Sequence, residues 1–242
     1  WALVPAGEFL SGQHNHAAML DYDFEIMITD VTVGQYLAYL NQVLAEGALR
    51  VDGERVIGFY PGDEFRGVKH EVEIPAGDYL FVPLDDPASR FTYDGSAFAA
   101  SPGHESHPMT NVSWFGAWGY CGASGARLPL ELEWEKAARG SDDDRPFPWG
   151  FDIDRNRANF YASRDPFEDM GSFGSRTSPV GFYNGSLRSK SDYSWPAAAS
   201  HGENAPHRRG GDNDDAHPHA LGNIDGRQIE AGARANPQQA HR

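Results

Sequence analysis

The sequence predicts an α+β domain that is rich in loops, with few helices and small, irregular sheets. Two observations lead to this prediction. Glycine and proline are frequent, with 27 Gly and 16 Pro in 242 residues, and both residue types interrupt regular structure. Hydrophobic residues make up 40% of the chain and charged residues only 23%, so a packed core is expected over most of the length. That length suits one large domain or two small ones.

The first fifty residues contain the clearest local patterns. Residues 3–12 alternate apolar and small side chains around a Pro-Ala-Gly turn, which predicts a strand, a turn and a second strand. Residues 22–28 alternate apolar and acidic side chains, which predicts another strand with one buried face. Apolar residues then recur at helical spacing from Thr32, a good N-cap, to Gly47, a good helix end. A helix is therefore expected between these two residues.

The segment 48–110 is typical of short strands and turns. Asp-Gly pairs at Asp52-Gly53 and Asp94-Gly95 each predict a hairpin turn. The apolar run at residues 78–84 predicts a strand between them. We expect this segment to hold insertions specific to this protein.

A second helix is expected from Trp114 to Cys121, with Ser113 as its N-cap. Trp114, Trp118 and Cys121 are spaced so that they fall on one face of this helix. We therefore expect both tryptophans to lie beside the cysteine in the apolar core, with Cys121 acting as a small buried hydrophobe.

A third helix is expected from Leu130 to Arg139, because its carboxylates come early and its basic side chains late, as the helix dipole favours. Trp134 in mid-helix is expected to bury a large area. Arg127, just before the helix, is expected to pair with a carboxylate such as Glu131 or Glu135.

Charge and composition exclude some classes of function. The net charge of −15 argues against binding to nucleic acid and to anionic membrane surfaces, because both require a basic patch. No apolar run approaches the roughly 18 residues of a membrane span, and no signal peptide is visible. Because the chain starts at Trp1 rather than Met, the compartment is left open between the cytoplasm and export. With a single cysteine, no disulfide can form within the chain.

An ordered series of motifs resembles the formylglycine-generating enzyme family, also called the sulfatase-modifying factor domain. The series runs VPAGEFLSG, TDVTVGQYLAYLN, HPMTNVSWFGAWGYCGASGARLPLELEWEKAARG, PFPWG, Asn159 and TSPVGFYNG. Each motif alone is weakly specific, whereas the whole series in order is strongly so. The resemblance covers residues 3–186 and implies a C-type-lectin-like fold, which agrees with the loop-rich α+β prediction above.

The resemblance stops in the C-terminal part, which divides the chain into two predicted regions. Residues 1–186 form an incomplete sulfatase-modifying-factor-like domain. Residues 187–242 form a divergent tail, predicted to be disordered, with two aromatics, half of the ten histidines and no periodic pattern. The family's G-N-V-W-E-W motif is missing, and Arg209-Gly210-Gly211 lacks the Ser-Trp that should follow it. Either the tail is genuine, or it is the frameshifted or truncated end of a normal gene.

The resemblance implies an enzyme that oxidises a substrate cysteine to formylglycine with copper(I) held by two cysteines. Copper(I) prefers two thiolates, and Cys121 is the only cysteine. We therefore predict that this chain is inactive as an oxidase, and we assign it no catalytic residue and no cofactor-binding residue. The alternative is a non-catalytic, lectin-like module for binding or display. A third reading, the domain of iron-dependent sulfoxide synthases, needs a His-rich helical domain that the chain does not show. The implied partner is a sulfatase-type polypeptide, and we expect a monomer.

A structural calcium site is also implied by the resemblance. In the family, Ca²⁺ is bound by an Asn, by the carbonyl after it and by an Asp further on. Here these would be Asn159, the Phe160 carbonyl, and Asp165 or Asp169. Oxygen ligands of this kind suit Ca²⁺. The alternative is a polar surface loop with turn-forming Asx residues.

The histidines carry weaker signals. His104 and His107 have the spacing of a metal pair but no third ligand nearby in the sequence, so a surface loop is expected. His217 and His219 belong to the tail, where no specific metal site is predicted.

Overall fold

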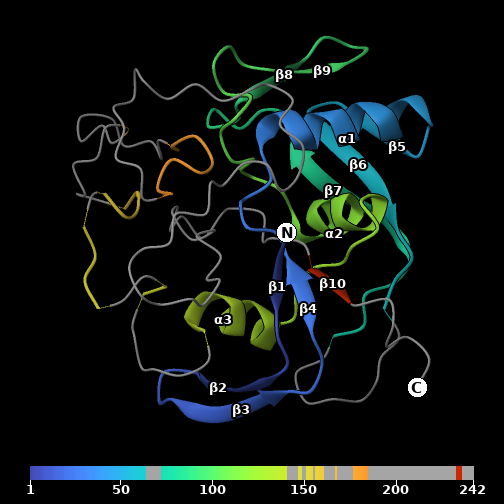
Figure 1. Cartoon of the computed structure of the whole chain (residues 1–242). Coiled ribbons are helices and arrows are strands. Elements are labelled where there is room, and N and C mark those ends of the chain that lie inside the picture. Colours follow the sequence, from blue (N-terminus) through green and yellow to red (C-terminus); the bar gives the residue numbers. More distant parts are fainter. Residues whose placement is uncertain are drawn as a thin grey trace.

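The computed structural model describes residues 1–63, 72–140, 147–148, 151–154, 156–160, 167, 177–184 and 233–235. Within these residues the chain forms three helices and ten short strands, and the strands pair in four small sheets (Figure 1). This confirms the loop-rich α+β prediction. The helices are α1 (Val33–Ala45), α2 (Trp114–Ala123) and α3 (Glu131–Arg139). The strands are β1 (Ala2–Val4), β2 (Gly7–Ser11), β3 (His16–Leu20), β4 (Phe24–Ile26), β5 (Leu49–Asp52), β6 (Arg55–Tyr60), β7 (Gly77–Pro83), β8 (Phe91–Tyr93), β9 (Phe98–Ala100) and β10 (Ala233–Ala235).

The N-terminal strands confirm the predicted strand, turn and strand, but the two strands enter different sheets. β1 pairs with β4, whereas β2 pairs with β3 in an antiparallel hairpin. Phe24 and Ile26 of β4 are buried while Glu25 between them is exposed, as the alternating sequence predicted.

β10 lies on the other edge of β4, so that Arg234 is opposite Glu25 in the antiparallel register. The sequence did not predict this strand, because residues 187–242 show no strand pattern. The tail residues from 187 to 232 lie outside the described residues, and its predicted disorder stays a prediction.

Helix α1 begins as predicted, at Thr32. The Thr32 hydroxyl accepts a hydrogen bond from the Gln35 amide at 3.1 Å, and the Gln35 side chain accepts one from the Thr32 amide at 2.9 Å. The first two backbone amides of α1, at its N-terminus, also have partners. Val33 donates to the His107 carbonyl and Gly34 donates to the Glu105 carbonyl. These bonds satisfy amides that would otherwise lack a partner, and they fasten the loop before α2 to the start of α1.

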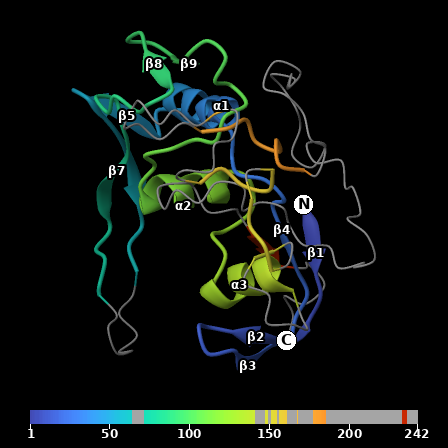
Figure 2. The same ribbon diagram turned by 90° about the vertical axis from the view of Figure 1, so that its left-hand side faces the viewer.

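The β5-β6-β7 sheet confirms the hairpin at Asp52-Gly53, and the β8-β9 pair confirms the one at Asp94-Gly95. Asp94 shapes its turn by accepting hydrogen bonds from the amides of Ser96 and Ala97. Helix α2 packs against β6 and β7 and also contacts α1, so one face of this sheet is covered (Figure 2).

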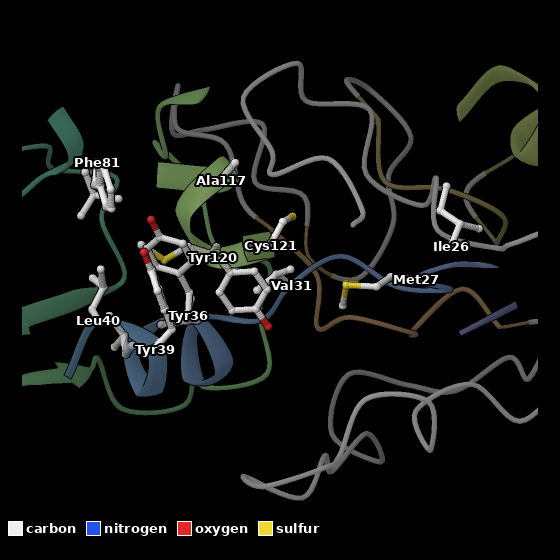
Figure 3. Packing of buried hydrophobic residues seen from close by; sticks show 14 of the residues in the cluster. Ile26, Met27, Val31, Tyr36, Tyr39, Leu40, Phe81, Ala117, Tyr120 and Cys121 are labelled. Atoms are coloured by element: carbon white, nitrogen blue, oxygen red, sulfur yellow. The ribbon is translucent and has the colours of Figure 1, made fainter. Parts of the chain in front are cut away.

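The core between α1 and α2 is aromatic. The rings of Tyr36, Tyr39 and Tyr120 lie with centroids 5.5–5.6 Å apart, and Cys121 lies beside them (Figure 3). Gly116 makes this close approach possible, because a Cβ at that position would lie 2.6 Å from the Tyr36 hydroxyl and 2.7 Å from the Phe81 carbonyl oxygen. The tyrosines therefore pack almost directly against the backbone of α2.

The prediction that Trp114 and Trp118 share the environment of Cys121 was wrong. Cys121 is buried, whereas the Trp114 side chain is 49% exposed, and both tryptophan rings pack edge-on against Tyr60 of β6. The residues point in similar directions around the helix, but seven residues separate Trp114 from Cys121 by about 10 Å along its axis. Trp114, in the first turn of α2, thus packs against Tyr60 of β6, whereas Cys121, near the end of the helix, packs in the core.

Helix α3 lies against the β2-β3 hairpin in both views (Figures 1 and 2). Its Glu133 is fully buried and accepts two hydrogen bonds from Arg127, at 2.7 and 2.5 Å. The expected pairing of Arg127 with a carboxylate is therefore confirmed, but its partner is Glu133 rather than Glu131 or Glu135. Which carboxylate faces inward depends on how the helix docks. Glu133 is also the third residue of the helix, so its carboxylate can accept a hydrogen bond from the Leu130 amide.

Trp134 is likewise more exposed than expected, with 38% of its surface accessible. The inward face of α3 is formed instead by Glu133, Lys136, Ala137 and Ala138. The Lys136 ammonium donates to the Gly7 carbonyl at 2.8 Å and lies 5.7 Å from the centroid of the Phe9 ring. A charged side chain thus attaches helix α3 to β2.

Candidate functional site

The predicted calcium loop begins at a well-defined turn. The Asn156 amide donates to the Asp154 carboxylate at 2.7 Å, which forms an Asx turn just before the predicted ligands. Ala158 follows and is fully buried, whereas Asn159 and Phe160 are half-buried. The first two predicted ligands are therefore held next to an anchored residue.

The remaining predicted ligands, Asp165 and Asp169, lie outside the described residues, so the full ligand set is a prediction. Between them in the sequence, Phe167 is buried. Its ring packs edge-on against Phe182, with centroids 4.7 Å apart, and against His107 at 6.3 Å. Two described residues that flank Asp165 in the sequence, Ala158 and Phe167, are thus buried.

The surface-loop prediction for the two histidines holds for His104 but was wrong for His107. His107 is 9% exposed, and its Nδ1 atom lies 2.7 Å from the Thr177 hydroxyl oxygen. The His104 ring nitrogen Nδ1 donates to the Pro102 carbonyl at 3.2 Å, and the two rings lie 4.9 Å apart. Sequence reasoning missed the burial because the covering residues come from Thr177 and Phe167, far along the chain.

In the part of the chain that the structure describes, no three His, Cys, Asp or Glu side chains gather in a way that could hold a metal ion. His217 and His219 lie outside that part. The donors proposed around Asn159 are amide, carbonyl and carboxylate oxygens, a set whose chemistry suits Ca²⁺.

Cys121 does not suit a copper site. Its side chain is 1% exposed, and burial raises the pKa of the thiol to about 11. Copper(I) binds thiolates, and two of them in the family site, whereas the sequence holds this one cysteine. The residues present therefore do not fit the copper of the family.

Sequence reasoning did not single out Asp30, which lies two residues before the N-cap of α1. Asp30 is half-buried. Burial raises its pKa to about 7. A neutral carboxylic acid at this point could donate a proton near pH 7. The sequence offered no signal, because Asp30 reads as an ordinary residue of a turn before a helix.

Comparison with known families gives a long match. The model for the sulfatase-modifying factor enzyme 1-like domain matches residues 1–215, most of the chain. The chain belongs to this family. The match confirms the resemblance drawn from the ordered motifs, and it runs past residue 186, where the sequence places the end of the domain. That boundary stays a prediction.

Curated relatives match over shorter stretches. The chain is 40% identical over 90 residues to a formylglycine-generating enzyme of Thermomonospora curvata, covering 36% of this chain and 29% of the relative. It is 44% identical over 62 residues to the inactive C-alpha-formylglycine-generating enzyme 2 of Bos taurus, covering 26% and 21%. A serine/threonine-protein kinase pkn1 of Chlamydia caviae is 40% identical over 75 residues, covering 31% and 12%. Each match thus spans less than a third of the relative.

In the described ranges, none of the helices is long and apolar enough to cross a membrane.

Proposed function

We propose that this chain is a formylglycine-generating-enzyme-like domain that does not itself oxidise cysteine. The observation that carries the proposal is the state of Cys121, which is buried and has a pKa of about 11. Oxidation through copper(I) needs accessible thiolates as ligands. A sulfatase-type polypeptide with a target cysteine remains the class of substrate that this family membership suggests.

A second candidate is a non-catalytic module that binds or displays a ligand on the same scaffold. It is favoured by the relatives, because one of those with similar identity is named as inactive and another carries the similar stretch inside a protein named as a kinase. Neither name establishes what this chain binds.

An oxidation assay tests the first proposal. The chain is incubated with copper(I), oxygen and a short peptide that carries a sulfatase-type cysteine, and aldehyde formation is followed by mass spectrometry. The Thermomonospora curvata relative serves as the positive control. We expect no aldehyde from this chain. Aldehyde formed by the wild type above a protein-free control would refute the proposal, and its loss in Cys121→Ser would assign the activity to this thiol.

We also propose that Asn159, the Phe160 carbonyl, and Asp165 or Asp169 hold a structural Ca²⁺ ion. The support is the oxygen donor set together with the anchoring of the loop at Ala158 and Phe167. The ion would hold the loop's backbone in place, as a cross-link does.

Calorimetric titration and thermal unfolding test this site. Ca²⁺ should bind and raise Tm by about 2–4 °C for each kcal/mol of binding free energy, and Mg²⁺ should do less. Asn159→Ala should abolish the shift, whereas Asn156→Ala, in the preceding turn, should keep it. Asp165→Asn and Asp169→Asn, made separately, identify the closing ligand. Equal shifts in all four variants would contradict the site.

A further inference from the structure

A cluster of aromatic rings lies where the first turn of α2 meets β6 and β7. We name it the aromatic patch and define it by four side chains around the buried ring of Tyr60: Tyr79, Trp114, Phe115 and Trp118. The ring of Trp118 lies 4.8 Å from that of Tyr60, and the ring of Trp114 lies at 5.5 Å, both edge-on. Tyr79 and Phe115 are stacked at 4.0 Å. The rings therefore support one another in a fixed arrangement.

The patch presents ring surface to solvent. The Trp114 side chain is 49% exposed, and Tyr79, Phe115 and Trp118 are half-buried, whereas Tyr60 is 2% exposed. The Tyr79 hydroxyl donates to the Pro75 carbonyl at 2.7 Å. With its hydrogen bond already made, Tyr79 offers the patch mainly its ring, which is the kind of surface that tryptophan-rich binding sites use.

In the part of the chain that the structure describes, a carboxylate lies beside the patch. The Tyr60 hydroxyl donates to the exposed Asp63 carboxylate at 2.5 Å. Asp63 also forms an isolated antiparallel β-bridge with Ile74. The exposed Glu73 is the residue directly before Ile74 in the chain. The whole chain carries a net charge of −15. Electron-rich ring faces beside carboxylates attract cations, and guanidinium groups stack on tryptophan especially well.

We propose that the aromatic patch, with Asp63, is a docking surface for a basic, arginine-bearing segment of a polypeptide. An arginine side chain would stack on Trp114 and reach the Asp63 carboxylate. Negative charge over the rest of the chain would speed the approach of such a segment and repel acidic ones. The patch shares no residue with the predicted calcium ligands, so this inference does not depend on whether the chain oxidises cysteine or binds calcium.

Fluorescence anisotropy with a labelled peptide tests the proposal. The probe alternates arginine with glycine and serine, and its control carries citrulline, which is neutral and of nearly the same shape, at every arginine position. We expect the arginine peptide to bind and the citrulline peptide to bind at least about fivefold more weakly. Raising the salt concentration towards 1 M should weaken the arginine peptide's binding, because charge attraction is screened.

Two variants and one matched control locate the binding. Trp114→Ala should weaken the affinity about tenfold, as loss of an aromatic anchor commonly does. Asp63→Asn, which leaves the rings in place, should weaken it about threefold and flatten the salt dependence. The control is Phe59→Ala, because Phe59 is 58% exposed but points to the opposite face of β6 from Tyr60. It should leave the affinity unchanged.

Several results would overturn the proposal. They are unchanged binding by both patch variants when circular dichroism shows them folded, equal binding of the citrulline peptide, and equal loss in Phe59→Ala. Sedimentation of the free protein gives a further outcome. If the wild type self-associates, Trp114→Ala does not, and no peptide binds, the patch is an interface between two copies.

Discussion

Helices α2 and α3 follow one another in the chain, yet they are attached to the rest of the protein by different interactions. Helix α2 is held by close packing of tyrosine rings against glycine positions, with the rings of Tyr36 and Tyr120 stacked 5.6 Å apart. Helix α3 is held by charged side chains, with Glu133 buried between Arg127 and Tyr22. The first attachment is sensitive to the volume of a side chain, and the second to its charge.

The charged attachment should show the largest single effect. Glu133→Ala removes the acceptor for Arg127, Tyr22 and the Leu130 amide together. The Arg127 side chain that loses its partner is 42% exposed, so the cost is smaller than for a fully buried pair, and urea unfolding should show a loss of about 2–3 kcal/mol. The control is Glu131→Ala on the exposed face of α3, which should change stability by no more than about 0.5 kcal/mol. Equal effects would mean that Glu133 does not hold the helix.

The packed attachment should respond to a single methyl group. In Gly116→Ala the new Cβ would lie 2.6 Å from the Tyr36 hydroxyl and 2.7 Å from a backbone oxygen of Phe81, and overpacking of this kind costs about 1–3 kcal/mol. Gly122→Ala, where nothing lies within 4 Å, should be neutral or stabilise the helix by up to about 1 kcal/mol. Thermal unfolding of both variants compares them directly. Similar Tm values would contradict the close fit.

The half-buried Asp30 predicts a dependence on pH. Its pKa in the folded state, about 7, lies above the ordinary value of 3.8, so the folded state binds the proton more tightly than the unfolded chain. The stability that this provides is present below about pH 4 and is lost as pH rises towards 7. Asp30→Asn should therefore raise the free energy of unfolding at pH 8 by about 1–2 kcal/mol and change it little at pH 4. The same gain at both values would show that ionisation is not the cause.

The smallest effect concerns the start of α3. Leu130 occupies the N-cap position with an extended backbone, is 56% exposed, and makes no capping hydrogen bond through its side chain. Leu130→Thr should add such a bond and stabilise the protein by about 1 kcal/mol. Leu130→Val, which is branched like threonine but has no hydroxyl, is the control. Urea unfolding that shows no difference between them would mean that the cap does not form.

Local signals in the sequence predicted local structure well. The N-cap at Thr32 and the Asp-Gly turns at Asp52 and Asp94 all formed where expected, since each depends on neighbouring residues. Partner choice was predicted poorly. Arg127 pairs with Glu133 rather than with Glu131 or Glu135. The docking of α3 on distant strands decides which of these carboxylates is buried.

The candidate site shows the same limit. The burial of His107 depends on Thr177, a residue that it meets only in the folded chain, and no local pattern marks it. Strand β10 is a further case, because its pairing with β4 joins residues about two hundred positions apart. The ordered motifs nevertheless predicted the family, because family membership can be inferred from the sequence without knowing which residues meet in the fold.

Because Cys121 is buried, the rate at which its thiol is chemically labelled reports on the opening of the core around it. A lone thiol that is 1% exposed, with a pKa of about 11, reacts with an alkylating reagent only when the packing between α1 and α2 opens. The rate at which the native protein takes up one such label therefore measures how often that core opens, without any engineered probe and without a second cysteine to confuse the signal.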